Sequence, residues 1–168
     1  WSSDVCSSDL GLALAALLAV APRAGAQDSG IPVGSKAPGA IVETLDGAPA
    51  DLAAWIGKEP VCIEFWATWC PNCKQLEPQL TALQKRYAGK VRFVGVAVSV
   101  NQKPEIVKRY VAAHGLQGEQ LYDKKGTATD AYDVPATSYV VVINAKGTVV
   151  YTGLGGRQDL AAAIAKAF

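Results

Sequence analysis

Two predominantly apolar runs mark the chain, at Val61 to Trp66, which has no turn-forming residue, and at Val91 to Val98. Both are rich in β-branched and aromatic side chains and hardly alternate with polar positions, which is typical of strands buried on both faces of a sheet. The chain after Cys70 has a helical period instead, with apolar positions four, three and four residues apart at Leu76, Leu80, Leu83 and Tyr87. This spacing predicts an amphipathic helix that Gly89 ends and that the internal Pro78 kinks.

Turn-forming residues divide the rest of the sequence into shorter elements. Composition predicts further strands at Ile41 to Leu45, Leu121 to Tyr122, Tyr139 to Ile143 and Thr148 to Thr152. Capping and breaking residues predict helices from Asp51 toward Ile56, from Pro104 to His114, from Thr127 to Tyr132 and from Asp159 to Phe168. The order of strand, helix, strand, helix, hairpin and helix predicts an α/β domain whose sheet mixes parallel and antiparallel strands.

The first 26 residues differ in character from the remainder. Gly11 to Val20 is an unbroken apolar run, and the small residues Ala24-Gly25-Ala26 follow it, which predicts a secretory signal cleaved before Gln27. The alternative is an uncleaved membrane anchor, but the run spans roughly 12 residues where a membrane helix needs about 20. Trp1 to Leu10 lacks the initiator Met and the basic residues of a signal, so we interpret it as foreign or mistranslated sequence. The expected domain is 27–168, with an irregular lead-in over 27–38.

Composition narrows the class of protein. Half of the residues are hydrophobic and 18% are charged, which fits one soluble globular domain. Sixteen Lys and Arg against fifteen Asp and Glu give a net charge of +1, so no basic field favours nucleic acid as a partner. We expect a monomer.

The cysteines point to chemistry rather than to structure. Once the leader is removed, Cys62, Cys70 and Cys73 remain, and the last two are three residues apart. A disulfide over so short a loop removes little chain entropy, so this pair is a poor structural staple. Cys70 precedes the predicted helix, whose N-terminus stabilises an anion and typically lowers a thiol pKa from about 8.5 toward roughly 3.5 to 7.5.

Residues three apart on a helix share a face, so Cys73 falls within disulfide reach of Cys70. Cys70 would attack a partner's disulfide and Cys73 would resolve the mixed intermediate. Half a zinc site and a pair of inert thiols are the alternatives. Zinc wants four ligands, whereas the chain has no second Cys-x-x-Cys and a single His. We therefore expect a redox pair, with no metal and no cofactor.

With these features the chain resembles the thioredoxin superfamily, and in particular the exported TlpA/ResA-like thiol-disulfide oxidoreductases. The matching stretches follow the family's order over nearly the whole mature chain, at Ala37 to Gly47, Glu64 to Pro78 and Val134 to Val150. The resemblance implies a thioredoxin-like fold, a central mixed sheet flanked by helices. The segment from Pro104 to Leu121 corresponds to a TlpA-like central insertion.

The resemblance also assigns roles around the thiols. It makes Cys70 the exposed nucleophile, Cys73 the buried resolving thiol, and Pro135 the residue whose cis peptide bond abuts the disulfide. A proline entering a strand would leave backbone groups of Val134 free to bind an extended substrate.

Glu64 lies six residues before Cys70, where thioredoxins have a buried acid that helps to deprotonate the resolving cysteine. Burial in an apolar strand would raise its pKa toward the working range, which suits a proton acceptor. The alternative is a structural acid at a sheet edge or in a pair with a lysine such as Lys90.

The remaining candidates have simpler interpretations. Trp69 flanks the nucleophile and is expected, with Pro71, in the surface that contacts the partner protein. Trp66 and Cys62 are expected in the core, and His114 is expected to have a structural role at a helix C-terminus.

The resulting hypothesis is an exported thiol-disulfide oxidoreductase, a reductase of periplasmic protein disulfides with a place in cytochrome c maturation. Its partners would be proteins with disulfides or thiols, and a membrane protein would supply electrons. Members of the ResA-like branch often have a glutamate three residues after the second cysteine, where this chain has Leu76 followed by Glu77. A copper-binding metallochaperone that uses Cys70 and Cys73 as soft ligands is the alternative from another class. A redox-silent scaffold is a third.

Overall fold

The computed structural model describes residues 30–168, so the predicted leader lies outside the described residues. Its centre is a seven-stranded sheet in the order β2-β1-β5-β4-β3-β6-β7. The strands are β1 Ile41–Thr44, β2 Pro49–Asp51, β3 Val61–Trp66, β4 Arg92–Val98, β5 Glu119–Asp123, β6 Tyr139–Ile143 and β7 Val149–Leu154. The helices are η1 Leu52–Ala54, α1 Pro71–Arg86, α2 Pro104–His114, α3 Thr127–Ala131 and α4 Leu160–Ala165.

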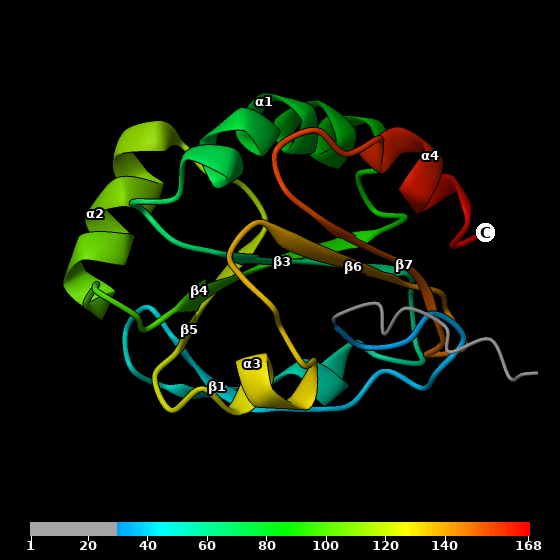
Figure 1. The fold of residues 1–168 in the computed structure, drawn as a ribbon, viewed down its shortest axis with the longest axis horizontal. Coiled ribbons are helices and arrows are strands. Elements are labelled where there is room, and N and C mark those ends of the chain that lie inside the picture. Colours follow the sequence, from blue (N-terminus) through cyan, green and yellow to red (C-terminus); the bar gives the residue numbers. More distant parts are fainter. Residues whose placement is uncertain (1–29) are drawn as a thin grey trace, which may run out of the picture.

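The sheet is mixed, as the sequence predicts. Strands β3, β4 and β5 run parallel, while β6 is antiparallel to β3 and forms a hairpin with β7. At the other end of the sheet, β1 pairs antiparallel with both β5 and β2. The insertion supplies α2 and β5, which lengthen the sheet beside β4 and place a helix near the start of α1 (Figure 1). A thioredoxin-like fold is confirmed.

Helices cover both faces of this sheet (Figure 1). Helices α1 and α4 pack on one face through Leu76, Leu80, Leu83, Leu160 and Ile164. Helix α3 packs on the other face, where Tyr132 joins the core formed with β3, β4 and β6. The layers therefore enclose two hydrophobic cores, one on each side of the sheet.

Side chains of β3 alternate between these cores, because successive residues of a strand point to opposite faces. Val61, Ile63 and Phe65 belong to the core under α3. Cys62 joins the core under α1 and α4, and Trp66 joins a cluster that contains both cysteines of the Cys-x-x-Cys pair. Glu64 lies between Cys62 and Trp66 on the strand and shares their face. The alternation thus turns a carboxyl group toward α1.

The predicted element boundaries agree with the structure at β3, β6 and α2. Helix α1 contains Pro78, as predicted. It ends at Arg86, with Tyr87 as its C-cap, and so stops before Gly89. Helix α4 ends at Ala165, three residues before the predicted end. Asp51 caps η1 by accepting a hydrogen bond from the backbone N–H of Ala53, as its position before the helix indicates.

A hydrogen bond from Tyr132 joins the N-terminal lead-in to the rest of the domain, and its contribution to stability can be tested. Its side chain is fully buried, and its hydroxyl donates a 2.8 Å hydrogen bond to the carbonyl oxygen of Pro38. Tyr132→Phe should lower the free energy of unfolding by about 1 to 3 kcal/mol in urea denaturation, because the Pro38 carbonyl loses its donor. Tyr87→Phe is the control and should change stability by less than about 0.5 kcal/mol. Equal effects of the two substitutions would contradict this account.

Candidate active site

Cys70 is the residue at which β3 and its following loop give way to α1. It is the N-cap of α1, in extended conformation, and its Sγ accepts a 3.1 Å hydrogen bond from the backbone N–H of Cys73. The two residues form a disulfide, with their Cα atoms 5.4 Å apart. Sequence spacing therefore predicted the correct pair.

The start of α1 is built to stabilise a negative sulfur. The helix has sixteen residues, its first turn has no acidic side chain, and Pro71 occupies a position whose N–H would lack a helical partner. Both features favour a thiolate at Cys70 once the disulfide is reduced. The expected contrast in exposure is wrong for the disulfide form, because Cys70 and Cys73 are each only 2% exposed. The residues around the disulfide therefore cover both sulfurs almost completely.

Gln102 fixes the loop that leads into Cys70, a role that the sequence did not reveal. Its buried Oε1 accepts hydrogen bonds from both the backbone N–H and the hydroxyl of Thr68, each at 2.9 Å. Its Nε2 donates to the carbonyl oxygen of Val98 at the end of β4. Trp69 is held in addition by a 2.9 Å hydrogen bond from its Nε1 to the Val100 carbonyl, and 45% of it remains exposed. The disulfide is thus anchored to the end of a neighbouring strand.

Glu64 is partly buried at the centre of the sheet. Strand β3 is paired on both sides, so Glu64 is not at a sheet edge, and no ion pair joins it to Lys90. Its Oε1 is inaccessible and has no hydrogen-bond partner among the described residues. Burial, and to a smaller extent the negative charge of Glu77, raises the pKa of Glu64 to about 8. Such a carboxyl group exchanges its proton near neutral pH.

A small internal cavity joins Glu64 to Cys73. Its volume is about 30 Å³, and Glu64, Trp66, Cys73, Glu77 and Gln120 are among the residues that line it. Three buried polar atoms of these residues lack a partner in the described part of the chain, namely Glu64 Oε1, Trp66 Nε1 and Gln120 Oε1. A polar cavity of this size accommodates a water molecule. Glu64 and Cys73 thus border one polar space that is large enough for a single water molecule.

The predicted cis bond at Pro135 is wrong. Every peptide bond of residues 30–168 is trans, and Pro135 is exposed. The chain comes alongside the end of β3 three residues later, where the buried Ser138 donates a 2.8 Å backbone hydrogen bond to the Phe65 carbonyl. Ser138 adopts a φ of 66°, and its own carbonyl oxygen accepts a hydrogen bond from Gln158. The resemblance had placed the residue beside the disulfide too early in the chain.

The backbone of Val134 also differs from the expectation. Its N–H is not free, because it donates a 2.9 Å hydrogen bond to the Thr129 carbonyl. Its side chain packs against the core under α3. The exposed part of this loop begins after it, at Pro135 and Ala136.

Cys62 and Trp66 are buried, as predicted. Burial, assisted by the charge of Glu64, raises the pKa of the Cys62 thiol to about 12, so it is unreactive at neutral pH. His114 ends α2 as expected, but it also lies 3.5 Å from Glu77, a contact that the sequence did not indicate. Within residues 30–168, no three side chains of His, Cys, Asp or Glu gather as a metal site would require.

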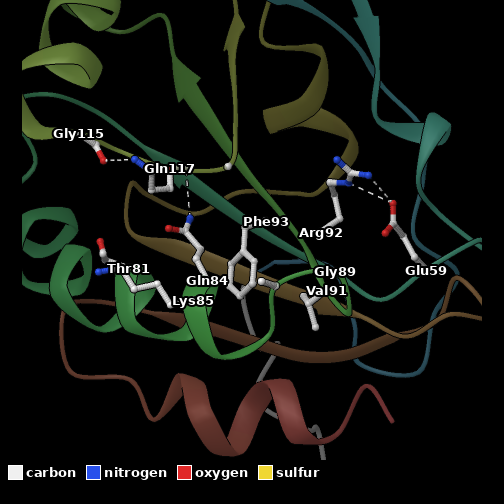
Figure 2. Close-up of a pocket in the computed structure, with 12 residues that line it drawn as sticks. Glu59, Thr81, Gln84, Lys85, Gly89, Val91, Arg92, Phe93, Gly115 and Gln117 are labelled. Carbon is white, nitrogen blue, oxygen red and sulfur yellow. Dashed lines mark hydrogen bonds and ion pairs between the residues drawn. The ribbon is translucent and has the colours of Figure 1, made fainter.

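A groove of about 580 Å³ lies away from the disulfide, beside the C-terminal half of α1 and the start of β4 (Figure 2). Its walls mix polar and apolar residues; among the polar ones, Arg92 pairs with Glu59, and Gln84 donates a hydrogen bond to the Gln117 carbonyl. Thr81, Gln84 and Gln117 form its boundary with the small cavity that contains Glu64. No helix of residues 30–168 has both the length and the apolar character needed to cross a membrane.

A disulfide at the start of the helix that follows a central parallel strand, in a mixed sheet covered by helices, defines a thioredoxin-fold thiol-disulfide oxidoreductase. The comparisons with known proteins agree. The chain belongs to the Redoxin family, whose sequence profile matches residues 32–167.

Individual relatives are similar over most of their length. The chain is 35% identical over 137 residues to the thioredoxin-like protein YneN of Bacillus subtilis strain 168, which covers 80% of this chain and 79% of that protein. It is 31% identical over 117 residues to the thiol-disulfide oxidoreductase ResA of the same strain, covering 70% and 64% of the two chains.

Solved structures show the same likeness. A secreted Mycobacterium tuberculosis disulfide oxidoreductase homologous to Escherichia coli DsbE is 30% identical, with a TM-score of 0.63 over 74% of this chain and 93% of that one. A thiol:disulfide interchange protein of the thioredoxin family from Chlorobium tepidum is 27% identical, with a TM-score of 0.68 over 81% and 97%.

The buried carboxyl of Glu64 makes stability depend on pH. The folded protein keeps the Glu64 proton up to a pKa of about 8, whereas the unfolded chain releases it near the ordinary pKa of about 4.3. Between these values the unfolded state binds fewer protons, so the stability contributed by this group falls as pH rises. Glu64→Gln removes the dependence. The variant's advantage in free energy of unfolding should therefore grow from about pH 5 to about pH 8 and then level off.

Urea denaturation of the oxidised proteins across this range measures the difference. Glu59→Gln is the matched control, because Glu59 is a surface acid paired with Arg92. It should not show a difference from wild type that grows over the same interval. A difference between Glu64→Gln and wild type that is independent of pH would show that Glu64 is already ionised at low pH.

Proposed function

We propose that the protein is a reductase of disulfides in exported proteins and that it works in the periplasm. The observation that supports this best is the Cys70–Cys73 disulfide at the start of α1 with the Glu64 carboxyl on the same small cavity as Cys73. This arrangement supplies a nucleophile, a resolving thiol and a proton acceptor.

The reaction uses two thiol exchanges. In the reduced protein, the Cys70 thiolate attacks one sulfur of a substrate disulfide, forming a mixed disulfide and releasing the first substrate sulfur as a thiolate that takes a proton from solvent. Cys73 then passes its proton toward Glu64 and attacks the Cys70 sulfur. The second substrate sulfur leaves, the Cys70–Cys73 disulfide forms, and two electrons have moved to the substrate. A dithiol donor must reduce the disulfide for the next cycle.

The charges around the pair support a reducing direction. A protein dithiol is a strong oxidant when its reduced form is strongly stabilised. The N-terminus of α1 stabilises a thiolate at Cys70, but Glu77, and Glu64 whenever it is ionised, oppose a second negative charge at Cys73. These carboxyl groups thus weaken the stabilisation of the fully deprotonated reduced form, which favours a reductant.

The setting follows from the predicted leader. A signal over residues 1–26, cleaved before Gln27, would deliver domain 27–168 to the periplasm, and the similar Mycobacterium tuberculosis oxidoreductase is a secreted protein. A reductant in an oxidising compartment needs a supply of electrons, so we expect a membrane protein as donor. Exported proteins with paired cysteines, apocytochromes c among them, are the substrates that we propose.

The substrate surface would surround the disulfide. Trp69 in the preceding loop, Pro71 at the start of α1 and Pro135 in the loop before β6 are exposed, and we assign them to contacts with the partner chain. Val134 would support this surface from beneath, because its side chain packs into the core. On the side of α4, a shallow polar recess of about 460 Å³ is lined by Asn72, Gln75, Leu154, Gly155, Gly156 and Arg157. A monomer presents all of these residues to a partner.

The direction of the reaction is tested by the equilibrium reduction potential of the Cys70–Cys73 pair, measured against dithiothreitol. We expect a value near the thioredoxin potential of about −270 mV, because two carboxyl groups oppose the dithiolate. A potential near about −120 mV would identify an oxidant instead. Cys62→Ala serves as the control, since its thiol is buried and takes no part in the couple.

The roles of the two thiols are tested by covalent trapping. Cys73→Ser should accumulate mixed disulfides at Cys70 with substrate proteins, because a serine hydroxyl does not attack a disulfide sulfur. Conjugates sensitive to dithiothreitol should appear on non-reducing gels of periplasmic extracts, and mass spectrometry should place the link at Cys70. Cys70→Ser is the matched control and should trap nothing. A folded, reduced Cys73→Ser protein that forms no conjugates, together with loss of Cu(I) binding in both variants, would favour the metallochaperone.

A further inference from the structure

Glu77 lies on α1 one turn after Cys73, and its carboxylate is tied to α2. Its Oε1 accepts a 2.6 Å hydrogen bond from the Tyr110 hydroxyl, and its Oε2 is 3.5 Å from Nδ1 of His114. The Glu77 side chain is 21% exposed and that of His114 is 43% exposed. Glu77 therefore stands between the buried cavity, which it lines together with Glu64 and Cys73, and a histidine at the surface.

Helix α2 holds this carboxylate in one place. Tyr110 and His114 are four residues apart, and their rings stack with centroids 3.8 Å apart. Tyr110 also packs on Trp66, with 5.6 Å between ring centroids, and the Lys74 ammonium lies 6.0 Å from the centroid of the Tyr110 ring. Burial and the bond to Glu77 raise the pKa of Tyr110, so it remains a neutral donor in the physiological range. The Glu77 charge is thus fixed in position relative to the cavity.

Apart from Glu64, Cys73 and Glu77, the residues that line the cavity include no side chain that gains or loses a proton. The boundary with the large groove of Figure 2 consists of Thr81, Gln84 and Gln117, which do not titrate. Strand β5 contributes the neutral Gln120. The charged and titratable groups that face Glu77 are therefore Glu64 from β3, Cys73 and Lys74 from α1, and Tyr110 and His114 from α2.

We propose that Glu77, positioned by Tyr110 and paired with His114, controls protonation of the Cys73–Glu64 cavity and sets the pH at which Cys73 resolves the mixed disulfide. Glu77 is a positioning residue in this scheme, because it acts through Glu64 and Cys73. The inference rests on the proposed function, in which Cys73 gives up its proton before it attacks Cys70.

The direction of the effect follows from the charges. An ionised Glu77 disfavours a second negative charge in the cavity, so Glu64 and Cys73 hold their protons to higher pH. A protonated His114 offsets the charge of Glu77 and makes deprotonation easier.

The experiment separates the two thiol exchanges with the aromatic disulfide dithiobis(nitrobenzoate) and the reduced protein in a stopped-flow instrument. Attack by Cys70 releases a first coloured thionitrobenzoate, and resolution by Cys73 releases a second. The rate of the second release is recorded against pH. A wild-type protein that releases no second equivalent would refute the proposed function itself, and the role of Glu77 with it.

Glu77→Gln should shift the midpoint of the second release to lower pH by roughly half to one unit, which is about three- to tenfold in rate below the midpoint. His114→Gln should slow the second release more at about pH 6 than at about pH 9, because only a protonated imidazole offsets the charge of Glu77. The rate of the first release should be little affected in both variants, since in this step Cys70 attacks the aromatic disulfide without help from Cys73 or Glu64.

Two controls make the result specific. Glu59→Gln removes an acidic side chain outside the cavity and should leave the midpoint in place. In a Glu64→Gln background, the shift caused by Glu77→Gln should shrink by at least half, because one of the two groups through which Glu77 acts is gone. An unchanged midpoint in Glu77→Gln, or an equal loss of rate at both pH values in His114→Gln, would overturn the proposal and leave a purely structural contact between α1 and α2.

Discussion

Strand β3 is hydrogen-bonded along both edges, to β4 and to β6, and the site depends on this constraint. Side chains of a strand in this place leave the sheet only through the layers that cover its faces. Glu64 therefore points under α1 rather than to water, which is the main reason for its raised pKa. The same strand ends at Trp66 and delivers the chain to Cys70 within a few residues. One strand thus positions both residues to which we assign the roles of proton acceptor and nucleophile.

Two opposing electrostatic influences meet at the disulfide. The N-terminus of α1 and the N–H of Cys73 stabilise negative charge on the Cys70 sulfur. Glu77, and Glu64 once it is ionised, oppose negative charge one helical turn deeper, around Cys73. The two sulfurs are covalent neighbours with different electrostatic surroundings. In the function that we propose, this contrast makes Cys70 the thiol that attacks first and Cys73 the thiol that loses its proton later.

Much of the fold could be predicted from local pattern. Periodicity, capping or spacing within a short window predicts the buried strands β3 and β6, helix α2 and the Cys-x-x-Cys pair. The local sequence of each was therefore enough to predict it. The buried acid at Glu64 was predicted from the resemblance to thioredoxins, which have an acid at this distance before the first cysteine. These features need no knowledge of what packs against them.

The features that could not be predicted depend on contacts between distant segments. Ser138, rather than Pro135, meets the end of β3, and this depends on the register of β6 against β3. Gln102 reaches back 34 residues to Thr68. Glu77 acquires its partners only because the insertion folds α2 against α1. No local pattern contains the information for such pairings, since each requires the assembled sheet.

The placement of Cys62 bears on how the protein matures. An odd number of cysteines in domain 27–168 invites incorrect pairing wherever oxidants form disulfides freely. Cys62 is buried on β3 beneath α1, and its high pKa suppresses the thiolate that exchange requires. In the folded protein, the pair that an oxidant can join is therefore Cys70 and Cys73, and Cys62 is kept out of exchange by burial.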